Sequence, residues 1–168
     1  MIHYRNEVRR SGIDGRAFVR VAKRLLGAVG EAESSLSIAL VGDETIRRLN
    51  RDHRGKDKPT DVLSFSLTGA PHASRAERPP RAKPVGPPKN AAHEWVPERL
   101  LGDVVISVET ARRQAAQYDA TLQRELYRLL IHGLLHVMGH DHERLGERKR
   151  MEAEERRLAR AIALPWPY

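Results

Sequence analysis

Half of the eight histidines in this sequence fall within eleven residues, in the run HGLLHVMGHDH at 132–142. On an α-helix, His132 and His136 project from one face about one turn apart, close enough to share an ion. Gly139 suits a left-handed helix end, and the turn after it can bring His142 back over the same face. Three protein ligands with one open position are typical of a catalytic zinc rather than a structural one. The spacing therefore predicts that His132, His136 and His142 bind one zinc ion.

Gly133 separates this motif from the proteases that share its spacing. The pattern His-x-x-x-His-x-x-Gly-x-x-His is that of the metzincin proteases, which place a glutamate general base where Gly133 stands. Peptide hydrolysis by that route is not expected, because a metalloprotease would need a carboxylate from elsewhere in the chain. A glycine inside a helix costs about 1 kcal/mol relative to alanine, which indicates that something packs closely against Gly133.

Four other residues, near the motif or near the expected cleft, have competing interpretations. Asp141 either holds a histidine N–H and fixes its tautomer or caps the following turn, and the two are weighted equally. His140 lies off the ligand spacing and is assigned to the surface or the pocket wall. Asp61 and Asp103 begin or precede strands, where either could orient water, but N-capping or turn formation is favoured for both.

The composition favours a polyanionic partner and restricts the choice of metal ligands. The 168 residues include 30 Lys and Arg against 22 Asp and Glu, a formal charge of +8, which suits nucleic acid or an acidic surface. There is no cysteine, so disulfides, thiolate catalysis and thiolate metal sites are excluded. The N-terminus lacks the apolar core of a signal peptide, and no run approaches the ~20 apolar residues of a membrane span. We therefore expect a soluble protein, and the lack of cysteine fits a reducing cytoplasm without requiring one.

Strand and helix patterns are interspersed, which predicts one α/β or α+β domain over 1–168, with a small mixed sheet packed with helices. Strands are expected at 2–8, 36–40, 60–67 and 103–107, and helices after Asp14, after Asp43, at 108–118, at 121–139 and at 145–163. Asp14 and Asp43 are the expected N-caps. A helix directly after the strand at 103–107 indicates a parallel crossover. Residues 69–98 hold seven of the ten prolines and are expected to form an exposed loop insertion.

Several segments of the chain together resemble the YbeY family of ribosomal-RNA maturation factors. They are residues 49–65, 101–107 and 132–142, together with Met151 and Glu155 in the final helix. The run at 132–142 resembles the family's His-Gly-x-Leu-His-x-x-Gly-aromatic-Asp-His signature, which places the zinc site on a central, metzincin-like helix. His53 and His140 stand where the family usually has an aromatic residue, and the Pro-rich insertion is not typical of it.

The resemblance implies a cytoplasmic, zinc-dependent endoribonuclease that is specific for single strands. Its roles would be ribosomal-RNA maturation, notably at the 3′ end of small-subunit RNA, and ribosome quality control, with the small subunit or its assembly factors as partners. The resemblance also implies that Arg54 acts beside the zinc, where its guanidinium would neutralise a phosphate through a forked contact. Arg51, Lys56 and Lys58 are candidate contacts to the RNA backbone, although Arg51 equally fits the outer face of a helix.

An alternative from another functional class stays open. The chain could be a non-catalytic RNA-binding factor of ribosome assembly with a structural zinc, which the missing glutamate at position 133 favours. The two differ in the metal site, because a structural zinc would be closed by a fourth protein ligand. Imidazoles also accept several divalent ions, so the spacing does not exclude nickel or another metal.

Overall fold

The computed structural model of the chain describes residues 1–67, 99–140 and 144–166. The elements follow in the order β1 (Ile2–Asn6), α1 (Gly15–Ala28), β2 (Ser35–Val41), α2 (Asp43–Arg54), β3 (Val62–Ser66), β4 (Leu100–Ser107), α3 (Val108–Gln117), α4 (Leu122–Val137) and α5 (Leu145–Ala161). Every predicted strand and helix is therefore present, with small shifts at its ends. The predicted loop insertion at 69–98 lies outside the described residues, as do Asp141 and His142.

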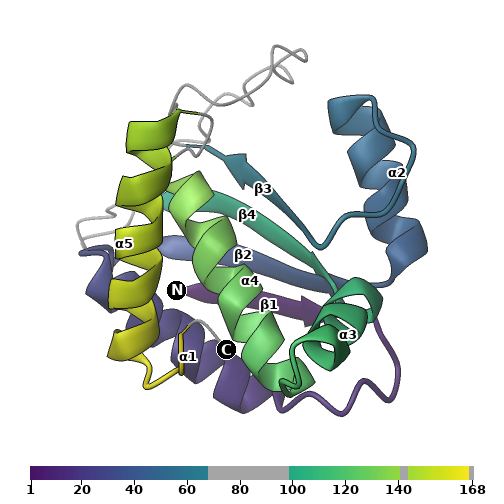
Figure 1. Ribbon diagram of the computed structural model, residues 1–168, viewed down its shortest axis with the longest axis horizontal. Coiled ribbons are helices and arrows are strands. Elements are labelled where there is room, and N and C mark those ends of the chain that lie inside the picture. The colour runs from purple at the N-terminus through teal and green to yellow at the C-terminus, as the bar shows by residue number, and fades with distance from the viewer. Residues whose placement is uncertain (68–98, 141–143, 167–168) are drawn as a thin grey trace, which may run out of the picture.

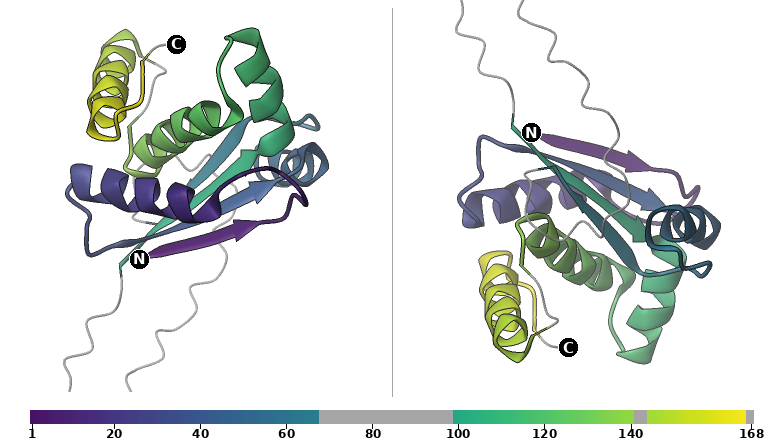
Figure 2. Two further views of the ribbon diagram at one scale, coloured as in Figure 1. Left: turned by 90° about the horizontal axis from the view of Figure 1, so that it is seen from below. Right: turned by 90° about the horizontal axis from the view of Figure 1, so that it is seen from above.

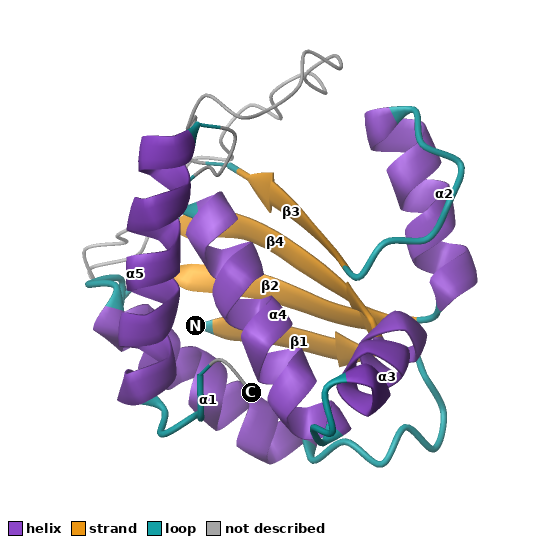
Figure 3. Ribbon diagram, viewed as in Figure 1, coloured by secondary structure: helices purple, strands orange, loops and turns teal. Residues whose placement is uncertain are grey.

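The four strands form one mixed sheet in the order β1-β2-β4-β3 (Figure 3). β2 pairs in parallel with β1 and β4, whereas β3 is antiparallel to β4, so the predicted small mixed sheet is confirmed. The crossover predicted after β4 is wrong, because no strand follows β4 among the described residues and α3 leads into α4. The parallel connections run instead from β1 through α1 to β2, and from β2 through α2 and β3 to β4.

Helices cover the two faces of the sheet unequally (Figures 1 and 2). α1, α4 and α5 lie together on one face, where their apolar side chains form the larger core with Val104 and Ile106 of β4. α2 packs through Ile46 in a smaller cluster with Leu63 and Val105. Because neighbouring side chains of a strand point to opposite faces, Val104 and Val105 place α4 and α2 on opposite faces of the sheet.

Two helix ends follow the sequence signals. Asp14 caps α1 as predicted, since its carboxylate accepts a hydrogen bond from the Ala17 N–H at 3.0 Å. Gly139 follows the end of α4 with a φ of 89°, the left-handed conformation that favours glycine, so this predicted helix stop is also confirmed. In the described parts of the chain, no helix has the length and apolar character that a membrane span requires.

The cap predicted at Asp43 is wrong. Asp43 is the first residue of α2, and the extended residue before it is Gly42. The Asp43 carboxylate accepts hydrogen bonds from the hydroxyls of Ser107 and Thr110, and it pairs with Arg113 at 2.8 Å. These partners belong to β4 and α3, more than sixty residues away in the chain, so the local cap signal could not reveal that Asp43 joins two helix starts.

Gly133 allows α4 to lie close to the sheet. A Cβ atom at this position would stand 2.7 Å from Cγ1 of Val104 and 3.2 Å from both Oγ of Ser64 and Cγ2 of Val62. Separations below 3.0 Å are essentially never seen for real Cβ atoms, so a larger residue would push the helix away from β3 and β4. The predicted close packing is confirmed, and it fixes the depth of the two helix histidines over the sheet.

Candidate metal centre

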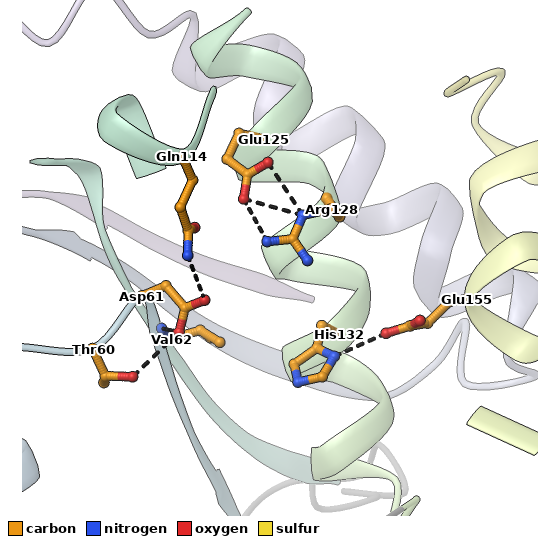
Figure 4. A network of polar contacts seen from close by, with 8 residues as sticks. All are labelled: Thr60, Asp61, Val62, Gln114, Glu125, Arg128, His132 and Glu155. Atoms are coloured by element: carbon orange, nitrogen blue, oxygen red, sulfur yellow. Dashed lines mark hydrogen bonds and ion pairs between the residues drawn. The ribbon is translucent and has the colours of Figure 1, made fainter. Parts of the chain in front are cut away.

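One stripe of α4 is polar, although the helix is otherwise largely buried in the core. The polar stripe consists of Glu125, Arg128, His132 and His136, whose spacing of three, four and four residues places them on one face. Figure 4 shows the first three of these side chains along the same side of the helix. The helix therefore brings two imidazoles, a guanidinium and a carboxylate into a single row.

His132 and His136 approach each other through their Nε2 atoms, which are 3.1 Å apart. Their rings are nearly perpendicular, with centroids 4.6 Å apart. Two imidazole nitrogens come this close only when a proton or a metal ion lies between their lone pairs, because two lone pairs repel each other. The structure thus brings these two residues together as their spacing predicts.

Glu155 of α5 holds the other ring nitrogen of His132. Its Oε1 lies 2.8 Å from Nδ1 of His132, and both side chains are largely removed from solvent (Figure 4). A carboxylate accepts a hydrogen bond from Nδ1–H, which leaves the lone pair on Nε2 and orients the ring. From the sequence, Asp141 was the candidate for such a role, and Glu155 was part of the family pattern alone. The spacing of Glu155 in the final helix could have indicated this role, because Glu155 shares the buried face of α5 with Met151 and Leu158.

The geometry of the histidine pair fits a shared zinc ion. Nitrogen ligands lie about 2.0–2.1 Å from zinc, so two of them on a tetrahedral ion are roughly 3.3 Å apart, close to the observed separation. A carboxylate behind one ligand is also usual in zinc sites. Within the described ranges no group of three or more potential ligands converges, and the predicted third ligand, His142, lies outside these ranges.

The charges around the polar stripe also favour a cation. Arg128 lies in the electrostatic field of three carboxylates, those of Glu125, Asp61 and Glu155. Among these described groups three carboxylates face one guanidinium, a balance that favours a cation at the histidine pair.

Asp61 forms turn contacts, as the sequence favoured, and also faces α4. Its Oδ1 accepts a hydrogen bond from the Val62 N–H at 2.9 Å and from the Thr60 hydroxyl at 3.2 Å. Its Oδ2 accepts one from Nε2 of Gln114 at 3.1 Å (Figure 4). The Asp61 carboxylate is therefore held in place on the side of the sheet where Arg128 lies.

Asp103 and His53 lie on the other face of the sheet. Both line a groove of about 810 Å³, together with Phe65, whose ring centroid is 5.0 Å from that of His53. Asp103 precedes Val104 in β4 and so points away from α4, which excludes it from orienting water at the histidine pair. His140 is half-buried, and its backbone N–H donates a hydrogen bond to the Leu135 carbonyl at 2.9 Å, at the turn that ends α4.

The basic residues predicted to contact RNA gather at the end of α2. Arg54 is the last residue of the helix and is exposed, as are Lys56 and Lys58 in the loop that follows. Arg51 pairs with Asp52 at 3.1 Å, which partly neutralises its charge. These four residues are here called the basic end of α2, and α2 packs on the face of the sheet opposite to α4.

A protein family, curated sequences and a solved structure are similar to this chain. The family described as Endoribonuclease YbeY matches residues 3–163. Curated proteins of that name are 46% identical in Anaeromyxobacter sp. over 85% of this chain, 44% in Myxococcus xanthus over 86%, and 39% in Geobacter sulfurreducens over 91%. The aligned part spans 62% and 43% of the first two relatives, less than two thirds of their length, and 89% of the third.

A solution structure of the Thermotoga maritima protein TM1509 has a similar fold. The TM-score is 0.60 at 22% sequence identity, with 96% of this chain and 89% of that chain covered. The family resemblance seen in the sequence is confirmed by the family match and by the relatives. The chain belongs to the YbeY family, whose name is that of an endoribonuclease, a hydrolase of phosphodiester bonds.

Proposed function

We propose that this chain is a zinc-dependent endoribonuclease that cleaves single-stranded RNA. The observation that carries the proposal is the 3.1 Å approach of the His132 and His136 Nε2 atoms, with Glu155 on the far nitrogen of His132. Family membership supports RNA as the substrate class, and the charge of +8 suits a polyanion. From the family we also propose a cytoplasmic role at the ribosomal small subunit, in 3′-end maturation of its RNA and in ribosome quality control.

In this proposal His132, His136 and His142 hold one ion. When bound, zinc would polarise a phosphoryl oxygen and lower the pKa of a water molecule to about 7, so no protein nucleophile is needed. Glu155 keeps the His132 ring in the tautomer that directs its Nε2 lone pair at the pair site. Asp141 remains a candidate to accept a hydrogen bond from the ring N–H of another histidine and so fix its tautomer.

We further propose that Arg54 stabilises negative charge on the phosphate, while Arg51, Lys56 and Lys58 hold the RNA backbone. The exposed position of all four side chains leaves them accessible to a long, flexible ligand. A guanidinium makes forked, charge-assisted contacts with phosphate, whereas the two lysines supply point charges whose attraction weakens with salt.

The proposed activity is tested by metal analysis of the purified protein joined to a cleavage assay on single-stranded RNA. We expect cleavage to stop when a chelator removes the metal and to return when zinc alone is added back. Double-stranded RNA of the same sequence is the matched substrate control and should be cut poorly. Zinc-loaded protein that binds the RNA without cutting it would favour the RNA-binding assembly factor instead, and unchanged cleavage by metal-free protein would refute the metal mechanism.

A further inference from the structure

Arg128 belongs to the same polar stripe of α4 as the histidines and lies one turn before His132. Side chains four residues apart on a helix are neighbours, so Arg128 and His132 lie on one face of α4. Figure 4 shows the Arg128 guanidinium turned toward Glu125 and the His132 ring further along α4, with Asp61 and Glu155 on either side of the helix. Arg128 therefore places a cation next to the buried side of α4, where Leu126 and Leu129 lie in the core.

Glu125 holds the Arg128 guanidinium in a fixed place. Glu125 is fully buried, and its two carboxylate oxygens accept hydrogen bonds from Nε of Arg128 at 3.1 Å each, with a further contact to Nη2. The Arg128 side chain remains 27% exposed. A guanidinium is planar and keeps its charge, so the Glu125–Arg128 pair can present a rigid cation to a third group.

Arg128 stays charged in this environment. Burial alone would lower the pKa of Arg128, but the hydrogen bond to Glu125 and the carboxylates of Glu125, Asp61 and Glu155 raise it overall. These carboxylates would repel the phosphate of an RNA strand, and Arg128 is the cation of the stripe that offsets them.

We infer that Arg128 is a further catalytic residue, which donates hydrogen bonds to a non-bridging oxygen of the scissile phosphodiester, and that Glu125 is its positioning residue. The inference rests on the proposed function, because it assumes that a phosphodiester is bound at the histidine pair. A guanidinium that is already aligned loses little freedom when it binds phosphate, and its contact strengthens in a site partly shielded from water.

The test measures cleavage of a short single-stranded RNA by the zinc-loaded full chain. Arg128→Met should lower kcat by about 100-fold or more, as the loss of one preorganised donor does, and should change KM by less than about threefold. Arg124→Met removes the same charge from an exposed position of the same helix and should stay within about twofold of the parent.

A second variant separates this role from a merely structural pair, because Arg128→Met leaves Glu125 buried without its partner. Glu125→Met combined with Arg128→Met removes both charges, and apolar residues of similar size usually preserve the fold. We expect this double variant to regain the melting temperature and zinc content of the parent while keeping the loss in kcat. Cleavage by the double variant at the parental rate would overturn the inference.

Binding of inorganic phosphate gives a readout that does not depend on cleavage. Phosphate should raise the melting temperature of the zinc-loaded parent and of Arg124→Met, and should raise that of the double variant much less. Equal stabilisation of parent and double variant would also overturn the inference. The parent could fail to cut RNA while phosphate still raises its melting temperature and does not raise that of the double variant. That result would contradict the proposed function and support the phosphate site.

Discussion

The polar stripe of α4 and the basic end of α2 carry the predicted chemistry in two different ways. In the stripe, Glu125 is fully buried and His132 is held from α5 by Glu155. At the end of α2, half of the Arg51 side chain is exposed, and its partner, Asp52, is its neighbour in the chain. Buried, partnered groups are preorganised, whereas exposed charges are mobile and screened by salt. Under the proposed function, the stripe is therefore suited to chemistry and the basic end of α2 to capture of the RNA strand.

Arg54 is the exception to this division, since it is proposed to act in catalysis from the exposed region. Arg54→Ala should leave zinc content and fold intact and lower turnover by about 10²- to 10³-fold, because one electrostatic contact to the transition state is lost. Arg54→Lys should restore part of the rate, since an ammonium keeps the charge but not the planar fork. Steady-state kinetics on single-stranded RNA measure both.

The control for Arg54 is Arg48→Ala, on the same helix and equally exposed. It should mainly weaken binding at raised salt, with turnover unchanged. If Arg54→Ala cuts saturating RNA at the parental rate, the basic end of α2 serves binding alone, and the catalytic role of Arg54 is withdrawn.

Glu155→Gln tests whether the histidine pair depends on its partner from α5. Loss of the carboxylate weakens the hold on the His132 tautomer, so zinc affinity should fall by about 10- to 100-fold. A competition titration with a fluorescent chelator measures the affinity, and Glu152→Gln, on the exposed side of α5, is the matched control. Equal zinc affinities in the two variants would show that the contact between Glu155 and His132 is incidental.

Gly133→Ala tests how closely α4 must lie on the sheet to form the stripe. The added Cβ atom meets Val104, so the free energy of unfolding should fall by about 1–3 kcal/mol. Gly27→Ala, in α1, meets nothing within 4 Å and should stabilise the protein by about 0.4–1 kcal/mol. Urea titrations compare the two, and a Gly133→Ala protein as stable as Gly27→Ala would contradict the packing account.

Patterns within one element were readable from the sequence. The apolar spacing predicted the strands and helices, and the spacing of His132 and His136 placed their imidazoles on one face of α4. Gly133 was predicted from helix propensity alone to mark a close contact, which the packing against β3 and β4 confirms. These inferences succeed because the helix and strand periods are local properties of the chain.

Contacts between elements were not readable in the same way. Glu155 meets His132 across twenty-three residues of sequence, and Asp43 meets Ser107 across sixty-four, so neither partner is implied by local spacing. Arg128 does not stand out in the sequence, where an arginine three residues after a glutamate is usually an exposed helix pair. Its partial burial follows from how α4 packs on the sheet, which local spacing does not reveal.

Asp43 gives the smallest expected effect and concerns stability rather than catalysis. Burial opposes its charge, but the hydrogen bonds from Ser107, Thr110 and Arg113 lower the pKa of Asp43 overall. A lowered pKa in the folded state contributes stability above the unfolded value of about 3.9, and this contribution is lost as the pH falls through the folded pKa. Asp43→Asn should therefore lower stability at neutral pH and flatten its decline below about pH 4, measured by thermal unfolding across pH. A parallel decline in both proteins would contradict this.

X-ray absorption spectroscopy at the zinc edge, together with the number of zinc ions bound per chain, tests whether the polar stripe of α4 is a metal site. The parent should bind one zinc ion per chain, with nitrogen ligands about 2.0–2.1 Å from the metal. His136→Ala should lose that ion, while His3→Ala, which removes an exposed histidine of β1, should retain it. One zinc ion per chain with an unchanged spectrum in His136→Ala would contradict the account.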